Sequence, residues 1–350
     1  MAFHDIPGNS RIKKILKLAL ERKRVPSAIL FCGPKGVGKR KTALTLAKAL
    51  NCLKRTDDSC DECENCRKID EGKMPDVIAI DVKGLNPDAK NHDSENPPHD
   101  LTSNERRRKS IGIKTMIGLK EIAYLMPMLG RKRVFIIDEA DRMTEPAANA
   151  HLKILEEPPL FTHIFLISEK PELLLPTVKS RCQTLAFLPI AKEDVESILR
   201  DAGVEEDKAG IAALFVRGNL DEALNTPWDE IQQKRREAWN FFRALVEKDA
   251  SSFFLKRFAF GRRSQVEEDL ARTLELFASF CRDLVLIKEK AAARLLFNPD
   301  YEGELRECEP LLDLGQTLRW MGLIDAALAN LDRHLNVSLL ASSLYSQVIG

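Results

Sequence analysis

The amino-acid sequence predicts an α/β fold class, with a parallel sheet in the first part of the chain and helical domains after it. Four short apolar runs have the length of strands, and helical patterns separate them. These runs are residues 27–33, 77–82, 134–138 and 163–168. Strands that alternate with helices favour a parallel sheet. After about residue 187 the strand patterns stop and apolar residues recur at helical spacing.

The order of these elements suggests three domains. Residues 11–23 place apolar side chains at helical spacing with basic residues opposite, which predicts an amphipathic surface helix ahead of the first strand. We expect residues 1–187 to form a domain of the nucleotide-binding type, 188–245 a small helical domain and 246–350 an all-helical domain. Residues 83–110 are rich in Asn, Asp, Pro and charge, which predicts a mobile insertion in the first domain.

Composition and charge limit the function only broadly. The chain has 350 residues, of which 44% are hydrophobic and 31% charged, and its formal net charge is +1. This near-neutral charge gives no global electrostatic case for nucleic-acid binding, so any contact with phosphates must come from local patches. No run of apolar residues is long enough to cross a bilayer, and the N-terminus lacks the apolar core of a signal peptide. We therefore expect a cytoplasmic protein.

A phosphate-binding loop is predicted between the first strand and the helix that follows it. The loop residues that match the pattern G-x-x-x-x-G-K-[ST], or lie within it, are Gly33, Gly36, Gly38 and Lys39. Glycines let backbone amides turn inward around a phosphate, and the lysine reaches the β- and γ-phosphates of a nucleotide. Arg40 stands where the pattern needs the hydroxyl that ligates Mg²⁺. Thr42 lies two residues on and points to a different side of the helix, so it is a poor substitute.

An acidic element ends the third predicted strand, in "VFIIDEADRM". Asp138 is placed to hold a metal ion, and Glu139 to orient or deprotonate the attacking water of a phosphoryl transfer. The alternative is a strand end capped by solvated acids. The phosphate-binding loop about a hundred residues earlier favours the first interpretation over this one.

Four cysteines within fifteen residues predict a metal site. They are Cys52, Cys60, Cys63 and Cys66, spaced x7, x2 and x2. Four thiolates at this spacing fit a closed, tetrahedral, structural zinc site in a module at 52–66. Structural zinc contributes roughly 10–16 kcal/mol to the folding of small peptides, so the metal could hold this polar segment together. An iron–sulfur cluster is the alternative, but nothing else in the chain suggests redox chemistry.

A final segment of interest is "LLLPTVKSRCQTLAF", residues 173–187. An arginine just past a strand and turn of a nucleotide-binding fold can stabilise charge on the γ-phosphate of a neighbouring subunit. Taken alone, Arg181 is more typical of a surface or salt-bridge arginine.

Together these segments resemble the clamp loader subunits of bacterial DNA polymerase III, which belong to the AAA+ class. The resemblance runs from "FHDIPGN" to the C-terminus, and its segments are residues 33–40, the cysteines of 52–66, 111–119, 134–141, 149–159 and 175–182. It implies that Arg181, in an S-R-C motif, reaches the ATP of an adjacent subunit and that Ser168 is the sensor 1 residue. It also implies a helical lid at 188–245 and a collar at 246–350 through which subunits form a ring.

Two departures from the ATP-hydrolysing members of this family stand out. Those members carry Thr or Ser where this chain has Arg40, and a sensor 2 arginine where "GNLDEAL" places Asp221. An acid facing a triphosphate repels where an arginine attracts. Two losses in the chain's own site, beside an Arg181 that acts on a neighbour, imply a scaffold with weak or absent ATPase activity. Bound ATP or ADP with Mg²⁺ remains compatible with the sequence.

The resemblance further implies partners in a hetero-pentamer. These are the gamma/tau motor subunits and the delta subunit, together with the sliding clamp and primer-template DNA. No membrane is involved. The alternatives are an active gamma/tau-type motor subunit, a zinc-dependent nucleic-acid-binding module and, less favoured, a metabolic kinase with a phosphate-binding loop.

Overall fold

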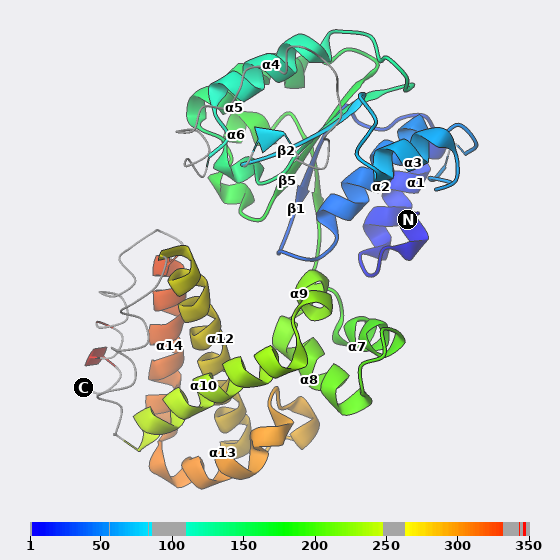
Figure 1. Ribbon diagram of the computed structural model, residues 1–350. Coiled ribbons are helices and arrows are strands. Elements are labelled where there is room, and N and C mark those ends of the chain that lie inside the picture. Colours follow the sequence, from blue (N-terminus) through cyan, green and yellow to red (C-terminus); the bar gives the residue numbers. More distant parts are fainter. Residues whose placement is uncertain are drawn as a thin grey trace. The chain divides into compact units, whose positions relative to one another are not determined.

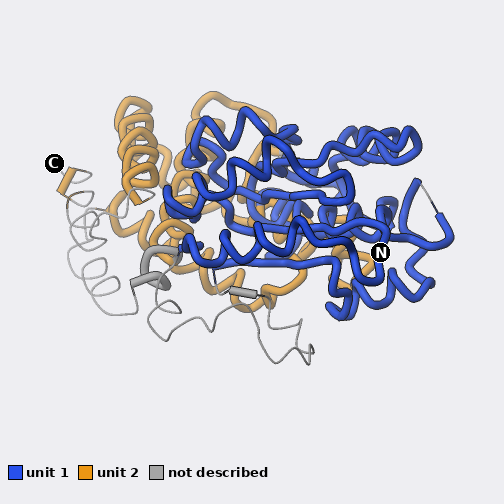
Figure 2. The backbone as a smooth tube through the Cα atoms, turned by 90° about the horizontal axis from the view of Figure 1, so that it is seen from above, with its two compact units in different colours: residues 1–195, 217–222 blue, residues 196–216, 223–350 orange. Residues whose placement is uncertain are grey.

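The computed structural model in Figure 1 describes residues 2–55, 57–82, 84–85, 110–247 and 263–331, with residues 343, 346 and 347. The chain forms two compact units, coloured separately in Figure 2. Unit 1 comprises residues 1–195 and 217–222, and unit 2 comprises residues 196–216 and 223–350. The division into domains at 187 and 245 stays a prediction. Most of the predicted insertion at 83–110 lies outside the described residues.

Unit 1 contains a six-stranded sheet with the order β3-β2-β4-β5-β1-β6. The strands are β1 (Ala28–Cys32), β2 (Val77–Asp81), β3 (Gly84–Leu85), β4 (Arg133–Ile137), β5 (Thr162–Ser168) and β6 (Gln183–Ala186). All neighbouring pairs are parallel except β2 with β3. The predicted α/β class with a parallel sheet is therefore confirmed.

Helices cover both faces of this sheet. They are α1 (Ser10–Glu21), α2 (Lys39–Asn51), α3 (Glu64–Asp70), α4 (Ile113–Ala123), α5 (Glu145–Glu156) and α6 (Pro176–Lys179). Residues of β1, β4 and β5 are buried on both faces and alternate between two apolar clusters, as the period of a strand requires. One cluster includes residues of α4 and α5, and the other includes residues of α1 and α2. Figure 1 shows these helix pairs on opposite sides of the sheet.

Unit 2 is helical in its described part. Its helices are α8 (Glu206–Val216), α10 (Trp228–Val246), α12 (Arg263–Lys288), α13 (Glu302–Cys308) and α14 (Leu314–Leu331), while α7 (Lys192–Asp201) and α9 (Leu220–Asn225) each have residues in both units. Aromatic side chains of α10, α12 and α14 pack together, with Phe242 5.3 Å from Phe277 and Trp320 5.8 Å from Phe277 between ring centroids. The prediction of helices after residue 187 is thus confirmed. No helix among the described residues is long and apolar enough to cross a membrane.

Candidate functional site

The predicted phosphate-binding loop leads from β1 into α2 through three glycines with positive φ. The φ angles are 139° at Gly33, 70° at Gly36 and 89° at Gly38, which is the residue before the first turn of α2. These backbone conformations are strained for residues with a Cβ. Space is also restricted, since a Cβ at Gly36 would lie 1.5 Å from Asn219 Oδ1. The loop therefore has the glycine-dependent shape that the sequence predicts.

Lys39 is buried within this loop, with 5% of its surface exposed. Its Nζ donates hydrogen bonds to the backbone oxygens of Gly33, at 2.7 Å, and of Pro34. Burial lowers the pKa of Lys39, while the carboxylates of Glu169, Asp138 and Asp141 raise it. The lysine is held against the loop into which a phosphate would fit.

Arg40 contacts the acid at the end of the third predicted strand. Its Nη1 lies 3.4 Å from Asp138 Oδ2, although these residues are 98 positions apart in the sequence. Asp138 follows β4, its backbone N–H donates to Ile80 O at 2.8 Å, and its Oδ1 accepts from the N–H of Glu139 at 3.0 Å. The structure thus brings together the loop and the acidic element, and a guanidinium lies beside the carboxylate predicted to hold a metal.

Glu139 has a left-handed backbone, with φ of 49°. Its carboxylate lies 3.5 Å from Arg142 Nη1. Burial raises the pKa of Glu139, the charge of Arg142 lowers it, and the neighbouring acids Asp138 and Asp81 raise it further. The net rise suits a proton acceptor, but the side chain is engaged with Arg142.

Ser168 is the last residue of β5 and is fully buried. Its hydroxyl donates to Asp141 Oδ1 at 2.6 Å and accepts from the backbone N–H of Lys170 at 3.1 Å. Asp141 lies in the segment "VFIIDEADRM", but the sequence pattern alone indicates no role for it. The structure makes this acid the partner that fixes Ser168.

The segment at 218–222 packs against the phosphate-binding loop within unit 1. The backbone N–H of Leu220 donates to Gly36 O at 3.2 Å, and Asp221 lies 3.6 Å from Lys41 Nζ. Thr42 is no substitute for the missing hydroxyl, because its own hydroxyl donates to Gly38 O at 2.8 Å. No pattern in the sequence indicates that Asn219 packs against Gly36 of the loop.

Arg181 lies between α6 and β6, so it follows a helical turn and precedes a strand that the sequence did not predict. Its Nε donates to Glu156 Oε1 at 2.8 Å, and its Nη1 donates to Thr177 O at 2.9 Å. A third of the side chain, 32%, is exposed. Within the described residues, the hydrogen-bond partners of Arg181 come from α5, α6 and the adjacent Ser180.

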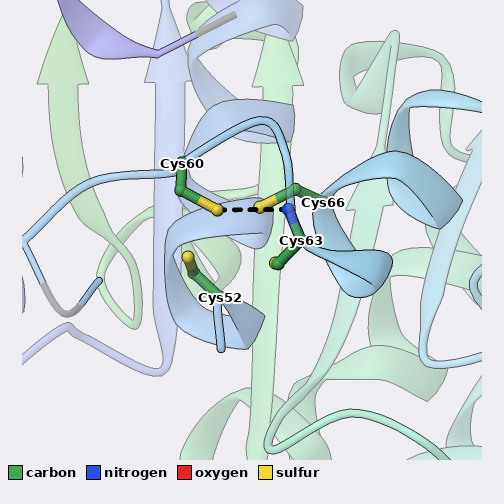
Figure 3. A group of neighbouring side chains, drawn as sticks. All are labelled: Cys52, Cys60, Cys63 and Cys66. Atoms are coloured by element: carbon green, nitrogen blue, oxygen red, sulfur yellow. Dashed lines mark hydrogen bonds between the residues drawn. The ribbon is translucent and has the colours of Figure 1, made fainter. Parts of the chain in front are cut away.

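The four predicted metal ligands lie together at one end of α2 (Figure 3). The Sγ atoms of Cys52, Cys60, Cys63 and Cys66 all lie within 4.8 Å of one another. Zinc with four thiolates at about 2.3 Å places sulfurs at a similar spacing. Backbone N–H groups of Arg55 and Cys63 approach the sulfurs of Cys52 and Cys60, each at 3.3 Å. The cluster therefore fits a structural zinc ion.

Charged contacts that the sequence did not predict fasten the cysteine segment to the rest of unit 1. The buried Asp58 accepts from the N–H of Phe3 at 3.1 Å and pairs with Lys17 at 3.0 Å. Lys48 of α2, which is 1% exposed, pairs with Asp70 at 3.0 Å and also with Asp61. The segment is therefore held by more than its thiols.

Parts of this chain are similar to known proteins. Residues 8–191 match a family model described as DNA polymerase III, delta subunit. The chain is 33% identical to DNA polymerase III subunit delta' of Bacillus subtilis over 245 residues, which cover 70% of this chain and 67% of that protein. It is 31% identical to DNA polymerase III subunit tau of the same organism, over 64% of this chain but only 36% of that protein. A crystal structure of a DNA polymerase III gamma subunit-related protein from Thermotoga maritima aligns over 96% of this chain and 98% of that one, with 16% identity and a TM-score of 0.41.

Proposed function

The chain belongs to the DNA polymerase III delta-subunit family, and we propose that it is the delta prime subunit of a bacterial clamp loader. In this role it is a scaffold that hydrolyses little or no ATP itself and completes the ATP site of a neighbouring motor subunit. Two matches support this assignment: the family model matches residues 8–191, and the chain is 33% identical to a delta' protein.

The ion pair between Arg40 and Asp138 is the observation that carries the proposal. Hydrolysis in phosphate-binding-loop enzymes needs a Mg²⁺ ion held by a hydroxyl after the lysine and by an acid at the end of a neighbouring strand. Here the first ligand is replaced by a cation, and that cation lies 3.4 Å from the second ligand. Divalent metal is repelled at the point where catalysis requires it.

The remaining parts of the site agree with a catalytically weak subunit. Glu139, the residue placed to activate water, contacts Arg142 at 3.5 Å. Ser168, at the sensor 1 position, donates its hydroxyl hydrogen bond to Asp141. Asp221, at the sensor 2 position, lies near Lys41 and brings a negative charge to the neighbourhood of the loop.

Arg181 is the residue that we assign to the neighbour's ATP. A finger acting on another subunit must be accessible at a surface and must be oriented before the phosphate arrives. Arg181 is partly exposed, and hydrogen bonds to Glu156 and Thr177 hold its guanidinium in place. Arg181 would place a positive charge beside the neighbour's γ-phosphate as negative charge develops there.

The rest of the chain would serve assembly. We assign residues 246–350 to a collar that joins gamma/tau and delta subunits into a hetero-pentamer, residues 188–245 to a lid, and the module at 52–66 to zinc in a structural role. The sliding clamp and primer-template DNA are the partners on which the complex acts. DNA affinity would fall steeply with salt, because backbone phosphates are contacted by basic residues.

An active motor subunit of the gamma/tau kind is the second candidate. Its support is the 31% identity to tau and the retention of Gly33, Gly38 and Lys39. It predicts ATP turnover by the purified chain that disappears in Lys39→Ala. The delta prime proposal predicts turnover at background level in both proteins.

The proposal is tested in a complex reconstituted from motor subunits, delta subunit and this chain. Replacement of Arg181 by alanine should lower the ATPase rate that clamp and primed DNA stimulate, without preventing assembly.

A further inference from the structure

Arg40 brings a positive charge to the phosphate-binding loop, beside Asp138. In the standard loop, the residue after the lysine and the acid of the neighbouring strand share one divalent cation, which also neutralises the phosphates. In this chain the same two positions, Arg40 and Asp138, contact each other directly. A positive charge therefore lies beside the carboxylate that holds the metal in related loops.

Asp138 is oriented for this contact. Its backbone N–H is bonded to Ile80 O, and its Oδ1 accepts from the N–H of Glu139. The first bond holds the backbone of Asp138 and the second holds its carboxylate, whose Oδ2 faces Arg40. The side chain of Asp138 is 23% exposed and that of Arg40 is 49% exposed, so the pair lies at the surface beside the start of α2 and is open to a ligand.

Arg40 has donors left for an anion. A guanidinium carries several N–H groups in a planar fork that matches phosphate oxygens. The contact that the structure describes for Arg40 uses Nη1 and Asp138 alone. Lys39 and the N-terminus of α2 lie next to it in the chain, and both favour negative charge.

We propose that Arg40 is a built-in cation in place of Mg²⁺, so that the loop binds the phosphates of a nucleotide, such as ADP, without a divalent ion. The inference rests on the proposed function in one respect, because it takes residues 33–39 as a phosphate site. Nucleotide held in this way is a static ligand. The bound nucleotide stabilises the loop, but it is not hydrolysed, because no metal ion is present to assist phosphoryl transfer.

The test is the affinity of the purified full-length chain for ADP, measured by calorimetry in a magnesium-free buffer that contains no chelator and again with Mg²⁺. Wild type should bind in both buffers, with dissociation constants that agree within about twofold. In Arg40→Thr the pattern's hydroxyl is restored and the guanidinium is lost. A charge-assisted hydrogen bond is worth roughly a tenfold to hundredfold change in affinity, so this variant should bind ADP more weakly by that factor in the magnesium-free buffer and recover with Mg²⁺.

Two further variants make the result specific to position 40. Lys41→Thr removes a cation from the adjacent position, where it faces Asp221, and should bind ADP equally with and without Mg²⁺. Arg40→Lys keeps a positive charge and should retain ADP binding in the magnesium-free buffer. Thermal unfolding of each variant shows whether the loop and helix remain folded.

Three results would overturn the inference: wild type that binds ADP only with Mg²⁺, wild type that binds no ADP at millimolar concentration, or Arg40→Thr that binds independently of Mg²⁺. None of these measurements involves Arg181 or a neighbouring subunit. If the ADP-binding prediction fails, the proposed role of Arg181 in another subunit's site still stands. If the role of Arg181 fails, the ADP-binding results are unaffected.

Discussion

Asp76 and Arg133 form a buried ion pair in unit 1, with 2.9 Å between Arg133 Nη2 and Asp76 Oδ1; the Asp76 side chain is 0% exposed and that of Arg133 is 4% exposed. The carboxylate also accepts three backbone N–H groups, from Met128, Leu129 and Gly130. Arg133 donates to the backbone oxygens of residues 122 and 126. The pair thus fixes the connection between α4 and β4, and through β4 the position of Asp138.

Asp76→Ala should destabilise the protein strongly. It leaves the Arg133 charge buried without its partner and removes the acceptor for three N–H groups, and breaking a buried pair costs about 3–5 kcal/mol. Denaturant unfolding measures the change. Glu71→Ala is the matched control, because its pair with Lys73 is exposed to solvent and contributes little to stability. Similar values for both variants would contradict this account.

His151 of α5 should make the protein sensitive to acid. The ring is 1% exposed, neither nitrogen has a hydrogen-bond partner in the described structure, and burial lowers its pKa from 6.5 to about 4. The folded pKa is below the unfolded one, so the stability that neutral His151 contributes is complete above pH 6.5. It is lost as the pH falls from 6.5 towards 4, because protons bind the unfolded chain first.

His151→Leu should remove this loss. From pH 7 to pH 5 wild type should lose about 2 kcal/mol more unfolding free energy than the variant, since each pH unit below 6.5 counts for about 1.4 kcal/mol. Urea unfolding at the two pH values gives the difference. His4→Ala, at a side chain that is 70% exposed, should behave as wild type. An equal pH response in wild type and His151→Leu would refute the explanation.

The cysteine cluster should hold one zinc ion per chain. Cys63→Ser should reduce the zinc content measured by mass spectrometry, whereas Cys182→Ser, at a lone cysteine, should not. Small zinc peptides unfold when the metal is removed. Chelation should lower the unfolding temperature of this chain without unfolding the segment completely, because the ion pairs of Asp58 and Lys48 still hold it. Purified chain without zinc, or equal metal loss in both variants, would rule out the site.

The strands that position the site could be predicted because they are continuous apolar runs. Residues of β1, β4 and β5 are buried on both faces, so nearly every residue carries the signal. The strand β6 could not be recognised, since three of its four residues are exposed and only Leu185 is buried. Its position at the edge of the sheet explains the weak pattern.

The site residues could be predicted by type but not by contact. The spacing in the sequence was enough to predict the four cysteines as metal ligands and the glycines as a phosphate-binding loop, because a metal site and a tight loop each require these residue types at fixed spacings. The pairing of Arg40 with Asp138, and of Ser168 with Asp141, joins segments 98 and 27 residues apart and depends on the register of parallel strands. The sequence motif placed Arg181, whereas its bond to Glu156 depends on the packing of α5 with α6.

The central claim is that this chain completes a neighbour's ATP site through Arg181. The most direct measurement is the ATPase rate, stimulated by clamp and primed DNA, of the reconstituted complex with wild type, Arg181→Ala or the control Arg200→Ala, whose exposed arginine pairs with Glu206. A finger is worth roughly 10³–10⁵ in rate at the site it serves. We predict that Arg181→Ala lowers the total rate by that site's share while the complex stays assembled and Arg200→Ala matches wild type. An unchanged rate in an intact Arg181→Ala complex would contradict the claim.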